Sequence, residues 1–481
     1  MNLFAQIADP TDLDLVRKVI ASSERPDDLV PLGIKSLEIS ADASHSATSA
    51  LAQLIQDAGG SPAGSRVVVL VDATAIFKGD VDLKKTVAEQ LAQEFDVEVV
   101  VLGDEHHLYA DDSAIDAASA ALEGAAGVVS VGSGTISDIA KVASTRQGGV
   151  PHVLVQTAAS VDGYTDNVSV VLKSGAKRTI DSRWPDVVLA DTETIATAPV
   201  ELNASGFGEL LSLFTAPADW WLAFQAGTDK TFHTTPRDLL LTFAGNPAEW
   251  GAGIGDGNQA AVEQLTRVLA IRGIGTGIAG TTACLSGMEH LVSHMLDMYA
   301  AANGHTTGLH GKQVGVASVV GAVAWEYLLE QIRSGRAVNL RSKAASLEAT
   351  VTSAFSGLDS TGALAAECWR DYAKKLSTID SGALVRLAQD ADKIVTDLGP
   401  TLPNSRELAV GLAKAGAAVG YRELDSWVTP QVWRWAVSNC HLMRNRVTIV
   451  DLLAELGWWL PTDVSAVLDR VDSLTKSVQN D

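Results

Sequence analysis

Four of the ten histidines fall within one short window, at His290, His294, His305 and His310. His290 and His294 are four residues apart, so on a helix they project from the same face. Upstream, Glu209 lies in an otherwise apolar helical segment, where a lone carboxylate is costly unless it is paired or bound to a metal ion. Two imidazoles and a carboxylate, with one position left open, are the pattern of a catalytic divalent-metal site. Surface histidines are the commoner source of such a window, so both interpretations stay open.

A glycine-rich segment, Gly-Ser-Gly-Thr-Ile-Ser-Asp, occupies residues 132–138 between an apolar strand and a helix. Glycines there let the backbone approach a pyrophosphate, and the first helical turn supplies N–H groups and the positive end of the helix dipole. The spacing departs from the usual G-x-G-x-x-G fingerprint. A tight strand-to-helix turn explains the glycines equally well, so this segment alone does not decide between a phosphate site and a simple turn.

A second polar segment, Thr-Ala-Ala-Ser at residues 157–160, follows the next apolar strand and is itself followed by Asp162 and Gly163. Small hydroxyl residues at the carboxyl end of a parallel strand lie where open α/β sheets bind ligands. A loop of turn-forming residues is the alternative, and this segment alone favours that simpler interpretation.

A parallel sheet is needed to position these segments, and the first part of the chain has the pattern for one. Apolar, β-branched runs indicate strands buried on both faces, and helical spacing occurs between them. Strands that alternate with helices predict a parallel sheet with right-handed crossovers, which is a Rossmann-like, nucleotide-binding arrangement. The expected strands are residues 66–72, 97–102, 128–131 and 152–155, and the expected helices are residues 84–95, 114–123 and 139–145, with a helical lead-in around residues 51–55.

The second part of the chain has the pattern of helices only, because no β-branched run interrupts its long apolar-periodic segments. We therefore expect an α/β dinucleotide-binding domain at residues 1–195, an all-helical domain at residues 196–481, and an active site in the cleft between them. The expected helical segments are residues 201–226, 260–269, 286–302, 313–334, 342–356, 364–376, 383–398, 405–415 and 447–456.

Length, charge and cysteine content narrow the class of protein. A chain of 481 residues is long enough for two domains. Its net charge of −22 repels phosphate backbones, so no nucleic-acid partner is expected, and solubility accounts for most of the acidity. Three widely spaced cysteines argue against a disulfide framework and fit a cytoplasmic protein. The start of the chain lacks a signal-peptide pattern, and no run approaches the roughly 20 apolar residues of a membrane span.

Several longer segments resemble one known family. Residues 286–294 and 309–316 are the most specific, and residues 157–163 are similar to a segment peculiar to one branch. Together the segments resemble the sn-glycerol-1-phosphate dehydrogenase branch of the iron-type alcohol dehydrogenase and dehydroquinate synthase superfamily, over roughly residues 65–460. The resemblance implies a dehydroquinate synthase-like fold. The remaining similar segments are residues 130–141, 191–193, 204–211, 219–220 and 444–453.

The resemblance also implies a role for individual residues. Glu209, His290 and His310 would bind one divalent metal ion, usually zinc, with nickel or iron in some relatives. His294 would face the substrate beside the metal, and Asp162 would contact the substrate. NAD or NADP would be held by the glycine-rich turn and the segment after the fourth strand. The expected cofactor-binding residues are Gly132, Ser133, Gly134, Thr135, Asp138, Thr157, Ala158, Ser160 and Asp166.

The implied activity is reduction of a small phosphorylated ketone, with dihydroxyacetone phosphate to sn-glycerol 1-phosphate, a reaction of phospholipid metabolism, as the first choice. A homo-oligomer is also expected. The alternatives are a cyclase or lyase of the dehydroquinate synthase type, which uses tightly held NAD, and an inactive homologue that keeps the metal for structure. Asp72, at the end of the first strand, would accept a ribose hydroxyl and favours NAD weakly, because a strand-end aspartate is more often a turn former.

Three positions depart from the pattern of the dehydrogenase branch. The branch carries Asp where this chain has Glu209, whereas dehydroquinate synthases carry Glu. Leu213 replaces an expected lysine, and Asp166 stands where a serine would touch the cofactor. These departures bear on the choice of substrate and on the cofactor contact.

Overall fold

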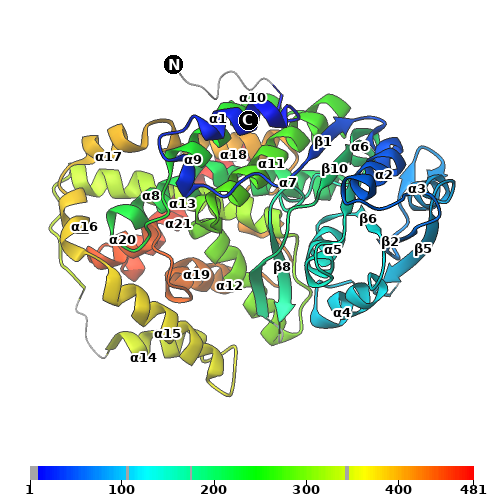
Figure 1. Ribbon diagram of the computed structural model, residues 1–481. Coiled ribbons are helices and arrows are strands. Elements are labelled where there is room, and N and C mark those ends of the chain that lie inside the picture. The colour runs from blue at the N-terminus through cyan, green and yellow to red at the C-terminus, as the bar shows by residue number, and fades with distance from the viewer. Residues whose placement is uncertain (1–8, 105–107, 174–175, 342–345, 403, 481) are drawn as a thin grey trace. The chain divides into compact units, whose positions relative to one another are not determined.

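A computed structural model describes residues 9–104, 108–173, 176–341, 346–402 and 404–480 (Figure 1). The chain forms two compact units. The first comprises Met1–Gly206, Asp238–Phe243 and Gly253–Gly280, and the second comprises Phe207–Arg237, Ala244–Ala252 and Thr281–Asp481. The domain boundary near residue 195 stays a prediction.

The first unit is built on a six-stranded sheet in which every neighbouring pair of strands is parallel. The α/β parallel architecture predicted for this part of the chain is confirmed. The strands at residues 66–72, 128–131 and 152–155 were predicted within a residue or two of their observed bounds. Across the sheet the order is β1 (Ser36–Ser40), β10 (Val187–Asp191), β7 (His152–Gln156), β6 (Gly127–Gly132), β2 (Arg66–Asp72) and β5 (Asp96–Leu102).

One predicted strand differs from expectation in its surroundings. Residues 97–102 do form a strand, β5, but β5 is the edge of the sheet and not a buried strand. Val99 and Val101 are 49% and 57% exposed. An apolar, β-branched run indicates a strand, but it does not say whether a second strand pairs on its outer side. The prediction that this strand is buried was therefore wrong.

Two strands of the main sheet and a separate hairpin were not predicted. β1 has the mixed composition Ser-Leu-Glu-Ile-Ser, and β10 is a five-residue run that ends in Asp191. β8 (Val168–Lys173) and β9 (Ala176–Asp181) form an antiparallel hairpin separate from the main sheet. Short strands of mixed composition give a weak alternation signal, which explains why the sequence pattern missed them.

Side chains of β2 alternate between two hydrophobic cores, as the pleat of a strand requires. Val67, Val69 and Val71 belong to one core, and Val68 and Leu70 belong to the other. Helices cover both faces of the sheet, which explains why its central strands read as continuous apolar runs (Figure 1). The helices are α2 (Ala47–Asp57) and α3 (Leu83–Leu91) in the first core, and α4 (Asp112–Ala121) and α5 (Gly134–Arg146) in the second.

The first unit also contains the long helix α11 (Gln259–Ala279), which packs against residues that follow the sheet strands. Its glycines allow close approach: a Cβ on Gly273 would lie 2.2 Å from Thr165 Oγ1, and one on Gly277 would lie 2.0 Å from the Trp184 ring. Two shorter helices of this unit are α1 (Leu13–Ala21) and α6 (Thr192–Thr197).

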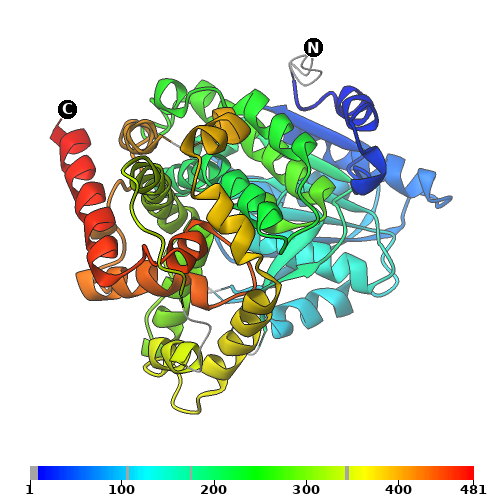
Figure 2. The same ribbon diagram turned by 90° about the vertical axis from the view of Figure 1, so that its left-hand side faces the viewer.

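The described residues of the second unit form helices joined by loops and turns, and none of them forms a strand, as predicted. Its central helix is α13 (His310–Arg333), which is buried on nearly every side, as expected for a helix that is apolar all round. The C-terminal helix α21 (Pro461–Asn480) packs against α13 and is drawn in red in Figure 2. The predicted helix at residues 342–356 begins in residues outside the described ones. The other helices include α8 (Ala216–Gln225), α12 (Met288–Asn303), α14 (Ser346–Phe355), α15 (Ala363–Thr378), α16 (Ser381–Leu387), α17 (Ala391–Leu398), α18 (Ser405–Lys414), α19 (Pro430–Asn439) and α20 (Ile449–Glu455).

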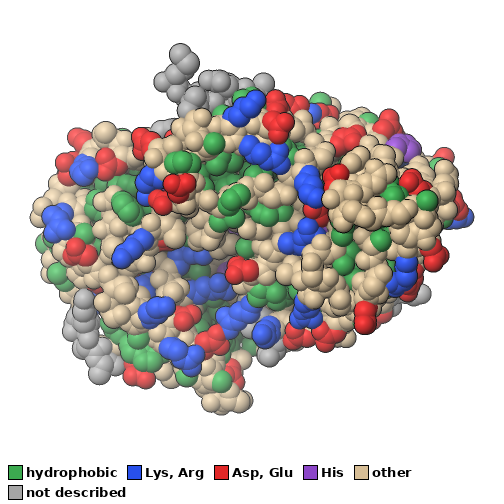
Figure 3. Space-filling model, viewed as in Figure 1, with side chains coloured by type: hydrophobic (Ala, Val, Ile, Leu, Met, Phe, Trp, Pro, Cys, Tyr) green, Lys and Arg blue, Asp and Glu red, His purple; other side chains and the backbone are tan. Residues whose placement is uncertain are grey.

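None of the described helices combines the length and the apolarity that a bilayer crossing requires. The three cysteines, Cys284, Cys368 and Cys440, are buried thiols. Acidic and basic side chains are interspersed on the face shown in Figure 3, so the excess of acid does not form one continuous patch there.

Candidate metal centre and dinucleotide turn

Glu209, His290 and His310 come together in the second unit. Each offers one ligand atom, and these atoms all lie within 4.8 Å of one another. His290 Nε2 is 3.2 Å from one carboxylate oxygen of Glu209, and His310 Nε2 is 3.7 Å from the other. Tetrahedral coordination with bonds of about 2.0–2.2 Å would place ligand atoms roughly 3.3–3.6 Å apart. The two printed separations, 3.2 and 3.7 Å, are therefore close to the spacing of ligand atoms around a metal ion.

Glycines make this convergence possible. Glu209 is near the end of α7 (Val200–Leu210), and His310 is the first residue of α13. A Cβ on Gly208 would lie 2.3 Å from the carbonyl oxygen of Gly311, and one on Gly315 would lie 2.7 Å from Gly208 Cα. The two helix backbones are thus in direct contact, which brings Glu209 to His310. Gly208, which adjoins Glu209, and Gly315, on the same helix as His310, therefore allow this close packing.

A buried carboxylate orients His290. Glu289 Oε1 lies 2.9 Å from His290 Nδ1 and also accepts the Gly287 amide N–H at 2.6 Å. Its other oxygen accepts the Thr215 hydroxyl at 2.8 Å. A carboxylate accepts the Nδ1 proton, so Nε2 is the ring nitrogen of His290 that is directed toward Glu209. Carboxylates that hold the outer nitrogen of a metal-binding histidine fix its tautomer in this way.

A neutral pair of side chains orients His310. Ser293 Oγ lies 2.9 Å from His310 Nδ1 and donates to Gln313 Oε1 at 2.7 Å. A hydroxyl has a single proton, and here the amide oxygen takes it. Ser293 Oγ must then accept the proton on His310 Nδ1, which leaves the Nε2 lone pair of His310 for a cation. The two histidines reach the same tautomer by different means.

Electrostatics at the centre favour a positive charge. Burial by itself lowers the pKa of His290, but Glu209 and Glu289 outweigh it and raise that pKa to about 9. In the metal-free protein a proton on Nε2 therefore satisfies the carboxylates. A divalent cation placed there would compete with that proton for the same lone pair.

His294 lies one helical turn beyond His290 on α12, and its ring centroid is 5.9 Å from that of His310. It is half-buried, and it lies beside the three candidate ligands without being one of them. Its predicted role toward a substrate stays a prediction.

In the first unit, the glycine-rich turn joins β6 to α5. β6 ends at Gly132, α5 begins at Gly134, and Ser133 precedes the helix in an extended conformation. The helical hydrogen bonds begin with Ser137 N–H to Ser133 O at 3.1 Å, so the amides of Gly134 to Ile136 lie before the helix ladder. An anion is stabilised by such amides and by the helix dipole. Thr135 lies on this first turn, and its predicted contact with the cofactor stays a prediction.

The segment after β7 lies beside this turn. Thr157 N–H donates to the carbonyl of Gly132 at 3.2 Å, which ties the ends of the two neighbouring strands together. Ser160 Oγ is 3.2 Å from the Tyr164 hydroxyl, which accepts the amide proton of Gly134. Ala158 is buried next to them. The structure thus brings both predicted cofactor segments together at the carboxyl ends of the neighbouring strands β6 and β7.

Asp138 and Asp166 are engaged with a lysine that the sequence reasoning did not single out. Lys141 Nζ is 3.2 Å from Asp138 Oδ1 and 2.7 Å from Asp166 Oδ1, and its side chain is fully buried. Burial raises the pKa of Asp166 to about 7, although Lys141 opposes that shift. Burial lowers the pKa of Lys141, but the two aspartates raise it by more. The predicted contact of both aspartates with a cofactor stays a prediction.

Two further predicted acids are also ion-paired. Asp162 Oδ2 is 3.0 Å from Arg272 Nε, on α11, and that arginine is 1% exposed. Asp72 forms an ion pair with Lys84. The partners Lys141, Arg272 and Lys84 were missed because a charge alone does not show which acid it will meet.

Part of this chain is similar to a known family and to curated relatives. The family described as iron-containing alcohol dehydrogenase matches residues 43–199. Glycerol-1-phosphate dehydrogenase (NAD(P)+) from Thermococcus kodakarensis is 33% identical over 215 residues, which are 44% of this chain and 60% of that protein. The protein of the same name from Methanosarcina mazei is 34% identical over 193 residues, which are 40% of this chain and 52% of that protein.

Over residues 43–199, the chain is similar to the iron-containing alcohol dehydrogenases.

Solved structures show a likeness of fold over most of the chain. A probable glycerol dehydrogenase from Sinorhizobium meliloti has a TM-score of 0.55 at 15% identity, and the match covers 93% of this chain and 98% of that one. Glycerol dehydrogenase from Schizosaccharomyces pombe has a TM-score of 0.56 at 14% identity, with 94% and 92% covered. The predicted fold class is confirmed.

The sequence match to the superfamily is uneven along the chain. The chain spans little more than half the length of the two curated relatives it matches. The family match includes the glycine-rich turn and residues 157–163, whereas Glu209, His290 and His310 lie beyond residue 199. The case for a metal centre therefore rests on its own geometry.

Proposed function

We propose that this protein is a metal-dependent dehydrogenase that uses NAD(H) or NADP(H) to interconvert a small phosphorylated ketone and its alcohol. The first reaction to test is dihydroxyacetone phosphate to sn-glycerol 1-phosphate. The observation that carries the proposal is the convergence of Glu209, His290 and His310 on one point. Three protein ligands with a position left open are typical of catalytic metal centres, whereas structural centres are closed by four.

The side chains present fit the groups that the proposal requires. Two imidazole nitrogens and a carboxylate suit zinc, with nickel or iron as alternatives. Glu289 and Ser293 hold the outer nitrogens of the two histidines and so leave both inner lone pairs for a cation. The turn at residues 132–134 precedes a helix start, where a pyrophosphate is stabilised.

Each residue then has a chemical task. When bound, a divalent cation supplies a Lewis acid that polarises a carbonyl, and a reduced nicotinamide supplies the hydride. Glu209, His290 and His310 hold the cation site in shape. His294, on the same helix face as His290, moves a proton to the oxygen that becomes the product hydroxyl. Asp162, held by Arg272, positions the substrate.

The substrate class comes from the name of the curated relatives, glycerol-1-phosphate dehydrogenase. Glu209 is the feature that favours the alternative, a cyclase or lyase of the dehydroquinate synthase type. The two differ in their use of the cofactor, because a cyclase with tightly held NAD consumes no reduced nicotinamide overall.

The test is the absorbance of the reduced nicotinamide band after mixing the protein with NADH or NADPH, Zn²⁺ and dihydroxyacetone phosphate. We expect a loss of absorbance that requires the ketone and is abolished by a chelator, with glycerol 1-phosphate as the product. Ni²⁺ and Fe²⁺ are run in parallel. No loss of absorbance with either cofactor and any of the three metals would contradict the proposal.

A further inference from the structure

The edge strand β5 has an unusual surface for the rim of a sheet. Within the described part of the chain it pairs with β2 on one side only. Val99 and Val101 are about half exposed, and the strand carries five apolar side chains in seven residues. Proteins normally protect a long apolar edge with charges, prolines, bulges or a covering element, because such an edge pairs readily with another strand.

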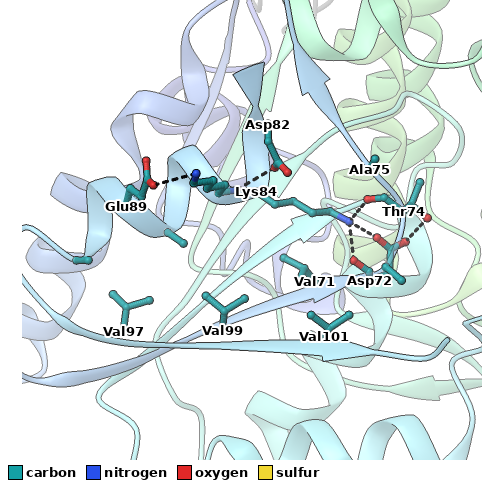
Figure 4. A pocket seen from close by; sticks show the side chains of 14 residues that line it. Val71, Asp72, Thr74, Ala75, Asp82, Lys84, Glu89, Val97, Val99 and Val101 are labelled. Carbon is teal, nitrogen blue, oxygen red and sulfur yellow. Dashed lines mark hydrogen bonds and ion pairs between the residues drawn. The ribbon is translucent and has the colours of Figure 1, made fainter. Parts of the chain in front are cut away.

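A groove runs along the exposed face of β5. Figure 4 shows Val97, Val99 and Val101 in a row along one side, with α3 along the other. The groove has a volume of about 580 Å³. Its remaining lining comes from the end of β2 and from the polar side of α3. The groove therefore combines an unpaired backbone edge with a continuous apolar row.

The groove lining carries a net charge of only −1, from Asp72, Asp82 and Glu89 against Lys84 and Lys85, although the chain as a whole carries −22. Lys84 pairs with Asp72, and Lys85 pairs with Glu89 at 3.7 Å (Figure 4). Glu98, on the outer face of the strand, pairs with Arg66 at 2.6 Å. Two acidic molecules repel each other over most of their surface. A second copy of this chain can approach here with little of that repulsion.

We propose that β5 pairs antiparallel with β5 of a second copy, about a two-fold axis at Val99, so that two six-stranded sheets become one continuous sheet. This register uses the whole length of the strand. It places Asp96 opposite Leu102, Val97 opposite Val101 and Glu98 opposite Val100.

The register is selected by charge and by burial. No carboxylate faces another in a register centred on Val99, whereas one centred on Glu98 would set two glutamates opposite each other, which is unfavourable. The same pairing joins the two valine rows on one face of the combined sheet. A two-fold contact of this kind uses one patch twice and closes, so it gives a discrete dimer and not a filament.

The first experiment measures the mass of the full-length protein in solution by light scattering or sedimentation, and it needs no enzymatic activity. We expect an even number of chains. Val99→Lys places a charge in the row and should halve that mass, with the circular dichroism spectrum unchanged. Val170→Lys is the matched control, because Val170 is an exposed strand valine (42%) on β8, and it should keep the wild-type mass. A monomeric wild type, or a Val99→Lys variant with the wild-type mass, would overturn the proposal.

A second experiment tests the register. Opposed residues of an antiparallel pair have Cα atoms about 4.5–5.5 Å apart, which suits a disulfide. Val99→Cys should therefore cross-link two chains under mild oxidation, whereas Val170→Cys should not. The native cysteines are buried thiols, so they should contribute little background. If Val99→Cys cross-links no better than Val170→Cys, the two-fold pairing at Val99 is wrong.

Discussion

The candidate metal centre and the glycine-rich turn proposed to bind the dinucleotide are built on different principles. The metal centre takes its three candidate ligands from α7, α12 and α13, so residues about a hundred positions apart must meet. The dinucleotide turn is nearly continuous in sequence, and it offers main-chain groups at the ends of β6 and β7. One site depends on the identity of individual side chains, and the other on the shape of the backbone.

This difference predicts different responses to mutation. Removal of a ligand side chain should abolish one function entirely, because a three-ligand centre has none to spare. A change in the turn should weaken binding by degrees, because several amides share the contact with a phosphate. The two regions should therefore be separable by experiment.

The largest effect is expected at the metal centre. His310→Ala should lose the metal and the activity together. His294→Ala should keep most of the metal but lose roughly 10²–10⁴-fold in turnover, because it removes a proton relay and not a ligand. Elemental analysis beside steady-state rates for both variants makes the comparison. Full metal occupancy in His310→Ala would show that the centre was wrongly assigned.

The dinucleotide turn should respond more weakly. A Cβ on Gly134 would lie 2.9 Å from Val161 Cγ2, so Gly134→Val crowds the turn. Overpacking costs about 1–3 kcal/mol, which corresponds to roughly 5- to 150-fold in affinity if binding bears all of it. Titration with NADH and NADPH should show the loss, with metal content unchanged. Gly357→Val is the control, since a Cβ there meets nothing within 4 Å. Equal affinities in the two variants would remove the turn from the cofactor site.

The contrast between continuous and dispersed segments also explains which elements the sequence predicts. β2, β6, β7 and α5 were predictable because each has a continuous apolar or periodic pattern. The outer side of β5 was not predictable, because pairing depends on a partner elsewhere in the chain. β1 was missed because its Ser-Leu-Glu-Ile-Ser run is too short and polar to stand out.

At the site, residue types suggested the three candidate ligands, and the family resemblance selected them. Glu289 directly precedes the histidine that it orients, whereas Ser293 orients His310 from 17 residues away in the sequence. Those positions were visible, but the direction of each hydrogen bond was not. Lys141 was hidden for a similar reason, since its two aspartates meet it only after folding.

A smaller effect is expected from the carboxylate behind His290. Glu289→Gln presents an amide that can donate to Nδ1 and favour the wrong tautomer, so metal affinity should fall about 10–100-fold. Thr215→Val is the control, because it removes another hydrogen bond to the same carboxylate without touching the histidine. Competition with a chromogenic chelator gives both affinities. An equal loss in the two variants would mean that Glu289 acts only by holding the local fold together.

The smallest effect concerns a histidine in the first unit, and it contrasts with His290. His152 is fully buried on β7, with Nε2 2.7 Å from Ser130 Oγ. Burial, together with the positive charges of Arg183 and Lys141, lowers the pKa of His152 to about 3, whereas the carboxylates around His290 raise the pKa of His290 to about 9. Histidine is thus neutral at position 152, within strand β7, and positively charged at position 290 in the metal-free centre.

The sign of the pH effect follows from the lowered pKa. His152 is neutral in the folded protein down to about pH 3, whereas it takes up a proton below about pH 6.5 once unfolded. The stability it contributes is therefore complete above pH 6.5 and is lost progressively as the pH falls toward 3. Between pH 7 and pH 5 the free energy of unfolding should fall by roughly 2 kcal/mol on this account. Urea unfolding of the wild type and of His152→Gln at both pH values isolates the contribution, because the variant has no imidazole to protonate. If the two proteins lose the same free energy between pH 7 and pH 5, His152 is not kept neutral by burial, and the contrast with His290 fails.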